Sequence, residues 1–140
     1  MLRLGCQYAA RYVCERTPLL RSIDAVVAIP ARPERYVDRM MALPDELAKS
    51  LREHLGLPYL PNALVSTVDE LEIKRLSHAE RRRAIRGSIS VGHTDMLSKR
   101  AVLIVDDVVT TGATLGEAAR MLSESGVRAV YGFALSHTEG

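Results

Sequence analysis

Three short stretches of the chain are apolar at successive positions, without the alternation of a half-exposed strand. They are residues 24–30, which begin with an aspartate and end with a proline, residues 102–105 and residues 129–135. Such runs are typical of strands that are buried on both faces of a parallel sheet. The hydrophobic pattern therefore predicts a core built from these strands.

Helical periodicity occurs before the first of these strands and between the others, with apolar residues at i, i+3, i+4 and i+7. The apolar positions are Cys6, Ala9, Ala10, Val13 and Cys14, then Leu47, Ala48, Leu51 and Leu55, then Leu115, Ala118, Ala119 and Leu122. We expect these helices to end near Pro18, Gly56 and Gly126. Strands that alternate with helices predict an α/β fold, with a mostly parallel twisted sheet flanked by helices.

Weaker signals lie between the second helix and the strand of residues 102–105. Residues 59–65 predict a strand, and Pro61 favours an edge position because proline cannot donate a backbone hydrogen bond. Residues 88–91 predict a second short strand. A short helix is expected between them, since Ser77 and Glu80 have the spacing of a capping box and Gly87 is a suitable stop.

Length and composition limit the class of protein. The 140 residues suit one domain, residues 1–140, and a hydrophobic content of 47% with a mean hydropathy of zero suits a globular chain. No apolar run approaches the ~20 residues of a membrane span. The N-terminus carries Arg3 and Arg11 and has no signal-peptide pattern. We therefore expect a cytoplasmic protein with no membrane partner.

Cys6 and Cys14 share one face of the first predicted helix. Their spacing of i, i+8 separates them by ~12 Å along the axis, which exceeds the Cα distance of a disulfide. There is no Cys-x-x-Cys pair and the four histidines are scattered, so a structural zinc site is not indicated. We expect both cysteines to be reduced core residues.

Two carboxylates and a loop rich in threonine follow the strand of residues 102–105. Asp106 and Asp107 are expected at a solvent-facing strand end, where parallel sheets bind ligands and where carboxylates can accept hydrogen bonds from neighbouring hydroxyls. The loop of residues 110–114 leads into a helix, whose first N–H groups and dipole favour a phosphate. Gly112 permits a close backbone approach or a positive φ. A phosphorylated sugar suits both parts, whereas the simpler alternative is an Asx turn followed by a Thr-capped helix.

The string of residues 102–114 resembles the phosphoribosyl-pyrophosphate (PRPP) signature of type I phosphoribosyltransferases. The resemblance implies that Asp106 and Asp107 hold the ribose hydroxyls. It implies that the 5′-phosphate is bound by Thr110, Thr111, Gly112, Ala113 and Thr114. The hypoxanthine-guanine branch usually has an aspartate where this chain has Thr110, so the loop does not support base-assisted purine chemistry.

The turn after residues 24–30 extends the resemblance. In phosphoribosyltransferases the loop after the first core strand binds pyrophosphate, and here that loop contains Ala31, Arg32 and Arg35. The two arginines supply the charge that an anion requires. By themselves, two arginines in a turn are equally consistent with a solvated surface.

Within this family the chain is similar to the ComF-like, competence-associated group of phosphoribosyltransferase-like proteins. The similarity runs from about Leu4 to the C-terminus and includes Pro30, Pro33, Arg35, residues 76–81, Arg86 and Gly87. The chain departs from the group at residues 39–43, where Arg-Gly-Phe-Asn-Gln is usual, and at Ile73 and Ala84, where polar residues are expected. The cysteine-rich zinc module that often precedes the domain is missing from this sequence.

Positive charge is concentrated in residues 74–86, although the net charge is only +2. Beside a predicted PRPP site, this segment resembles the flexible hood that covers the active site in this fold, and we call residues 67–91 the hood. The candidates to reach the pyrophosphate or the acceptor are Lys74, Arg75 and Arg81. For any single arginine a solvated helix face is the simpler explanation. Single-stranded nucleic acid is a weaker alternative, since the segment lacks stacking aromatics.

The expected activity is transfer of the 5-phosphoribosyl group from PRPP to an unknown nitrogenous, nucleobase-like acceptor, with release of pyrophosphate. The resemblance adds Mg²⁺ bound through PRPP, with no direct protein ligand, and no residue is a convincing general base. One alternative is a non-catalytic PRPP or nucleotide sensor, or a competence-linked accessory protein. Another is a response-regulator receiver, but only 33 residues follow Asp107, too few for its remaining βα units. A homodimer is left open.

Overall fold

A parallel three-stranded sheet forms the centre of the protein. The computed structural model describes residues 1–30, 43–67, 72, 75–109 and 111–138. The strands β1 (Ala25–Ala28), β4 (Ala101–Val109) and β5 (Ala129–His137) lie in the order β1-β4-β5. All pairs are parallel, so β4 occupies the middle of the sheet. The predicted core strands are confirmed.

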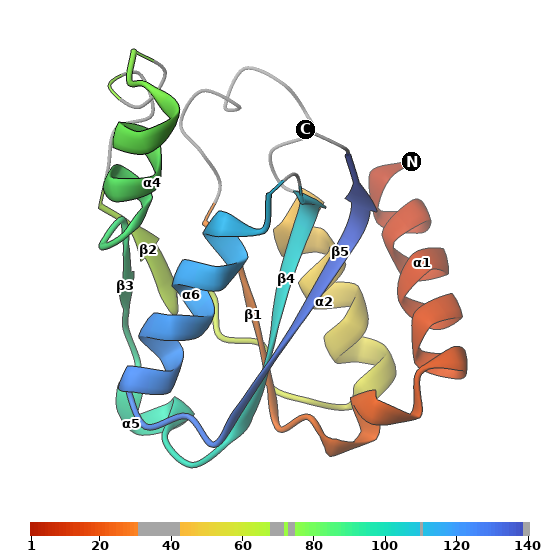
Figure 1. The fold of residues 1–140 in the computed structure, drawn as a ribbon. Coiled ribbons are helices and arrows are strands. Elements are labelled where there is room, and N and C mark those ends of the chain that lie inside the picture. The colour runs from red at the N-terminus through yellow and green to blue at the C-terminus, as the bar shows by residue number, and fades with distance from the viewer. Residues whose placement is uncertain (31–42, 68–71, 73–74, 110, 139–140) are drawn as a thin grey trace.

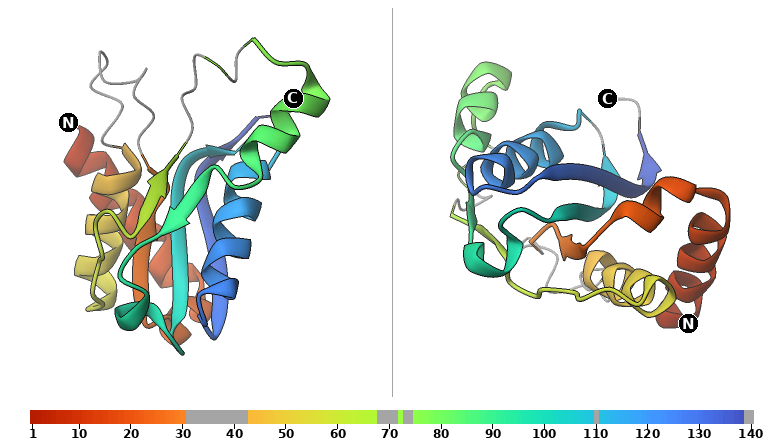
Figure 2. Two further views of the ribbon diagram at one scale, coloured as in Figure 1. Left: turned by 90° about the vertical axis from the view of Figure 1, so that its left-hand side faces the viewer. Right: turned by 90° about the horizontal axis from the view of Figure 1, so that it is seen from below.

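Helices cover both faces of this sheet (Figures 1 and 2). On one face, α1 (Leu2–Arg16) and α2 (Leu43–Leu55) pack in a core with Val26, Leu103 and Val105. A short 3₁₀ helix, η1 (Pro18–Ser22), joins α1 to β1. On the other face, α6 (Ala113–Glu124) packs in a core with Val102 and Ile104. The predicted single α/β domain, mostly parallel and flanked by helices, is confirmed.

The remaining elements form an antiparallel ribbon with two helices. β2 (Leu64–Ser66) pairs with β3 (Ile89–Val91), α4 (His78–Ile85) lies between them in sequence, and α5 (Thr94–Leu97) follows β3. In Figure 1, α4 lies at the upper end of the molecule, where β4 and β5 end and α6 begins. The described part of the hood therefore lies beside the edge of the sheet at which a ligand is expected.

The predicted strand of residues 59–65 is wrong in its extent. Tyr59 forms only an isolated parallel bridge with Val26, and the strand proper begins at Leu64. A turn at Pro61 and Asn62 divides the segment, and Asn62 has a φ of 58°. The first part therefore lies beside β1 and the second pairs with β3, because the turn redirects the chain between two different partners.

The predicted capping box and glycine stops are confirmed. Ser77 and Glu80 form a capping box at the start of α4, and Gly56, Gly87 and Gly126 all have positive φ after the helices they end. Cys6 and Cys14 are free thiols, and burial raises the pKa of both. Over the ranges that the structure describes, no helix is long and apolar enough to cross a membrane.

Candidate functional site

The middle strand β4 extends beyond its neighbour β1. The pairing of β1 with β4 ends at Ala28 and Val105, and the Ile29 N–H donates to the Val105 carbonyl oxygen at 2.8 Å. On its other side β4 stays paired with β5 as far as Val109 and His137. Among the residues that the structure describes, β4 is therefore paired at the two acidic residues only on its β5 side.

Asp106 and Asp107 are buried, each with 7% of its surface exposed. The expectation of a solvent-facing strand end was wrong, because both side chains are buried and β4 continues beyond them to Val109. Asp106 Oδ1 accepts the Asp107 N–H, and Asp107 Oδ1 accepts the Val108 N–H, each at 2.8 Å. Both carboxylates thus accept a bond from the backbone of the strand that carries them.

The two carboxylates occupy opposite faces of the sheet. Along β4, Val102 and Ile104 belong to the core beneath α6, whereas Leu103 and Val105 belong to the core beneath α1 and α2. Side chains of a strand alternate between its faces, so Asp106 continues the α6 face and Asp107 continues the opposite one. A ligand at this strand end would therefore meet Asp106 on the side where α6 begins.

The predicted phosphate loop joins β4 to α6. Thr110 lies outside the described residues, and Thr111 is exposed. Gly112 is the N-cap residue of α6, and its φ of 76° confirms the expected left-handed conformation. The Ala113 N–H donates to Thr111 Oγ1 at 3.3 Å, and Thr114 lies in the first turn. This geometry places a glycine and two threonines at the start of the helix.

The first turn of α6 contains no acidic residue, unlike those of three other helices. Asp45 and Glu46 lie in the first turn of α2, Glu80 in that of α4 and Asp95 in that of α5. Acidic side chains near a helix start interact favourably with its dipole and with its free N–H groups. Without such a side chain, the start of α6 keeps a positive potential that favours a bound anion.

The predicted pyrophosphate residues Ala31, Arg32 and Arg35 lie outside the described residues. The described chain stops at Pro30, beside the end of β4, and resumes at Leu43. There the Tyr59 hydroxyl donates to Asp45 Oδ1, and burial together with this bond raises the pKa of the tyrosine. This contact fixes the start of α2 against the segment that lies beside β1.

The hood candidates differ in exposure. Lys74 lies outside the described residues, and Arg75 is exposed. Arg81 is half-buried, on the same side of α4 as the half-buried Ala84 and Ile85. Its Nε is buried without a hydrogen-bond partner among the residues that the structure describes. Arg81 is therefore the hood arginine that faces inward.

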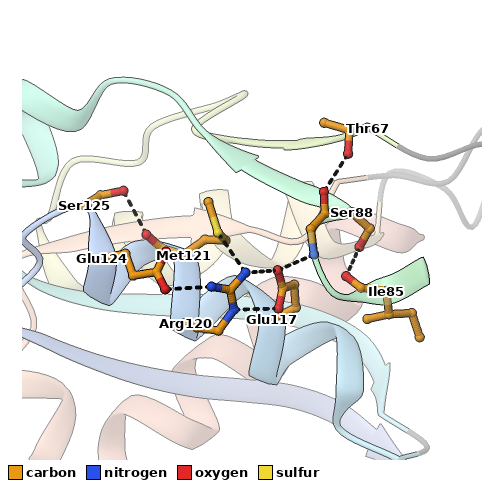
Figure 3. Close-up of polar contacts among 9 residues, drawn as sticks. Thr67, Ile85, Ser88, Glu117, Arg120, Met121, Glu124 and Ser125 are labelled. Atoms are coloured by element: carbon orange, nitrogen blue, oxygen red, sulfur yellow. Dashed lines mark hydrogen bonds and ion pairs between the residues drawn. The ribbon is translucent and has the colours of Figure 1, made fainter. Parts of the chain in front are cut away.

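Glu117 is a buried polar residue of this region that sequence reasoning missed. Its carboxylate accepts a hydrogen bond from the Gly87 N–H of the hood and forms an ion pair with Arg120 (Figure 3). The i, i+3 spacing of Glu117 and Arg120 is typical of an exposed helical ion pair. The residue that contacts Glu117, Gly87, lies 30 residues earlier. The neighbours of Glu117 in the sequence therefore give no sign that its side chain is buried.

Fold and site together define an α/β domain whose parallel sheet carries two buried carboxylates and a glycine-capped helix start near the carboxyl end of its middle strand. The family model of the phosphoribosyl transferase domain matches residues 21–138. The chain therefore belongs to the phosphoribosyl transferase domain family.

Two curated relatives agree with the expected likeness to competence-associated proteins. Competence protein F of Haemophilus influenzae is 29% identical over 88% of this chain and 54% of its own length. The DNA utilization protein YhgH of Escherichia coli is 30% identical over 88% of this chain and 53% of its own length. The chain thus spans about half the length of these relatives.

A solved structure shows the same fold. The glutamine PRPP amidotransferase of Bacillus subtilis, complexed with ADP and GMP, superposes with a TM-score of 0.64 and is 20% identical. The match covers 96% of this chain and 26% of the amidotransferase chain. At this identity the likeness concerns the fold alone.

The left-handed conformation of Gly112 can be tested by substitution. A Cβ added at Gly112 would meet no atom within 4 Å, so Gly112→Ala should lose roughly 1–2 kcal/mol of unfolding free energy from backbone strain alone. Gly116→Ala is the matched control, because Gly116 lies inside α6 with equal space and without a positive φ. It should gain about 0.5–1 kcal/mol. Equal effects of the two substitutions in urea denaturation would contradict the conformation of the loop.

Proposed function

We propose that this protein binds PRPP together with Mg²⁺ and transfers the 5-phosphoribosyl group to a nitrogenous, nucleobase-like acceptor. One observation carries the proposal: in a member of this family, two buried carboxylates lie near the end of the middle strand, and the helix that follows has no acidic residue in its first turn. The carboxylates suit ribose hydroxyls, and the helix start suits a phosphate. A 5-phosphoribosyl ligand carries both kinds of group.

The proposed chemistry depends on charge separation at C1′ of the ribose. As the bond to pyrophosphate breaks, positive charge develops on the ring and negative charge on the leaving group. In this scheme Asp106 and Asp107 orient the ring, and Thr110, Thr111, Gly112, Ala113 and Thr114 bind the 5′-phosphate. Fixed geometry and preorganised charge supply most of the rate enhancement in such reactions.

Positive groups receive the leaving pyrophosphate in this scheme. The backbone at Ala31 and the guanidinium groups of Arg32 and Arg35 would contact it from the loop after β1. Lys74, Arg75 and Arg81 would contact it from the hood. Arg81 has the strongest support, because it faces inward and its buried Nε has no partner among the described residues. A buried donor without an acceptor is unusual, and a guanidinium forms its strongest hydrogen bonds with anions.

The residues at the strand end fit an ion that arrives with its substrate. Mg²⁺ prefers oxygen ligands and commonly binds through phosphates with one or two carboxylates. Asp106 and Asp107 supply such oxygens. Within the described ranges, no three His, Cys, Asp or Glu side chains are grouped to hold a metal ion, and the proposal assigns the ion to PRPP oxygens. Bound with PRPP, Mg²⁺ neutralises part of the charge on the pyrophosphate.

Replacing both carboxylates tests the donor site. Asp106→Asn with Asp107→Asn keeps the size of the side chains but removes both charges, so the Kd of PRPP with Mg²⁺ should rise at least about 100-fold. Isothermal titration calorimetry measures the affinity, and circular dichroism checks the fold. Asp95→Asn, on exposed α5, is the control and should bind like the wild type. Unchanged affinity in the double variant would contradict the proposal. If the wild type binds PRPP but releases no pyrophosphate with any base of a panel, the protein is a sensor.

The inward arginine of α4 should affect turnover more than binding. Arg81→Gln should lower the rate of pyrophosphate release about tenfold or more while changing the Kd of PRPP less, if the contact forms mainly in the reacting complex. Arg82→Gln, one position along the same helix but exposed, is the matched control. Equal losses of rate and affinity at Arg81 would instead indicate a simple electrostatic contact with bound PRPP.

A second candidate function, in DNA handling, is favoured by the outer surface of α4. Arg82 and Arg83 are exposed there, Arg86 is exposed just after the helix, and two relatives are named for competence and DNA utilization. Phosphate contacts by arginines give affinity that falls steeply with salt and depends little on sequence. This surface suits the backbone of a nucleic acid.

Fluorescence anisotropy with labelled single-stranded DNA tests this candidate. Arg82→Gln with Arg83→Gln should weaken binding and reduce the slope of log K against log salt by roughly 1.4, at ~0.7 per phosphate contact. Arg81→Gln should change the slope less, because Arg81 faces the protein. No measurable binding at low salt would contradict DNA handling, and it would leave the PRPP proposal unaffected.

A further inference from the structure

The carboxylate of Glu117 joins the hood to the helix that begins at the phosphate loop. Its side chain is only 6% exposed, although it lies on the polar side of the predicted apolar stripe of α6. Oε1 accepts a hydrogen bond from the Gly87 N–H at 2.7 Å. A buried carboxylate is stable only when it is hydrogen-bonded or paired with a positive charge. The partners of Glu117 therefore indicate its role.

Gly87 is the point at which three parts of the hood meet. It follows the end of α4 with a φ of 89°, a conformation that suits glycine. Its carbonyl oxygen accepts the Thr67 hydroxyl at 3.0 Å (Figure 3). The next carbonyl oxygen, of Ser88, accepts the Thr67 N–H at 2.7 Å. The two bonds of Thr67 therefore hold the residue after β2 against the turn between α4 and β3, and the bond to Glu117 attaches this turn to α6.

The charge of Glu117 is balanced within its own helix. Arg120 donates from Nε to Oε2 at 3.0 Å and from Nη2 to Oε1 at 2.7 Å. These hydrogen bonds are the main reason why the pKa of the Glu117 carboxyl is lowered, while burial opposes them. Arg120 also pairs with Glu124 at 2.6 Å. The ionised carboxylate is thus available as a strong acceptor for the backbone of the hood.

Glu117 lies four residues after Ala113, the first residue of α6. Glu117, to which the hood is attached, therefore lies about one helical turn from the start of α6, where the proposed 5′-phosphate binds. Arg81 lies six residues before Gly87, on the inward side of α4. The position of its guanidinium relative to the phosphate loop thus depends on where the end of α4 is held.

We propose that Glu117 is a positioning residue, which sets the hood, and Arg81 in particular, relative to the phosphate loop. The inference rests on the proposed PRPP site and explains how the hood is held in position beside that site. Glu117 itself does not touch the ligand in this scheme. It acts through the backbone of Gly87.

Amide hydrogen exchange tests the attachment without any ligand. In Glu117→Ala, exchange at Gly87 and in β3 should accelerate about tenfold or more, because a charge-assisted hydrogen bond is lost. Glu117→Gln retains an oxygen acceptor and should restore most of the protection. Glu124→Gln is the matched control, since it neutralises the other carboxylate that pairs with Arg120 and leaves the bond to Gly87 in place. It should leave the exchange rate of the Gly87 amide unchanged. Unchanged exchange in Glu117→Ala would overturn the inference.

A double-mutant cycle tests the positioning role. Glu117→Ala and Arg81→Gln should each raise the Kd of PRPP or lower pyrophosphate release, and the double variant should lose less than the product of the two effects. Glu117→Gln should recover most of the loss. Effects that simply multiply would overturn positioning and leave only a stabilising contact. If wild-type protein does not bind PRPP, the proposed function fails and positioning fails with it, whereas the exchange data still report on the attachment.

Discussion

The site depends on the unequal lengths of the strands on the two sides of β4. β1 pairs with β4 only as far as Val105, whereas β5 continues to Val109. Over the shared part, β4 is enclosed by two strands and by helices on both faces, which demands apolar side chains. Beyond Val105 the described residues pair with β4 only on the β5 side, and the first two positions of this part carry aspartates. The two aspartates begin at this boundary, and the next helix, α6, starts eight residues after Val105.

Burial changes what the acidic pair can do. In a solvated turn, a carboxylate would be held only by water and neighbouring charges. Within β4, each Oδ1 accepts a backbone N–H of its own strand at 2.8 Å, and such hydrogen bonds stabilise the ionised form. Held in this way, the carboxylates lose little conformational freedom when a hydroxyl binds. The strand thus supplies the preorganisation that a positioning mechanism requires.

Sequence reasoning succeeded where the structure follows from neighbouring residues. The apolar runs, the capping box of Ser77 and Glu80 and the positive φ of Gly112 all have local causes. It failed where contacts between residues far apart in the sequence determine the local structure or the burial of a side chain. The turn at Asn62 divides the predicted strand of residues 59–65, Asp106 and Asp107 are buried, and Glu117 bonds to Gly87, which lies 30 residues earlier. The site residues in the loop after β1 lie outside the described part and remain predictions.

Arg81, Arg82 and Arg83 are consecutive residues of α4, yet their side chains have different environments. Arg81 shares its side of the helix with Ala84 and Ile85, while Arg82 and Arg83 are exposed. A guanidinium held near protein groups is partly desolvated, so its bond to a bound anion is strengthened and specific in geometry. An exposed one gains little from any single phosphate and acts mainly through long-range, salt-dependent attraction. One short helix can therefore serve a phosphosugar on its inner side and a polyanion on its outer side, because the two roles require different degrees of burial.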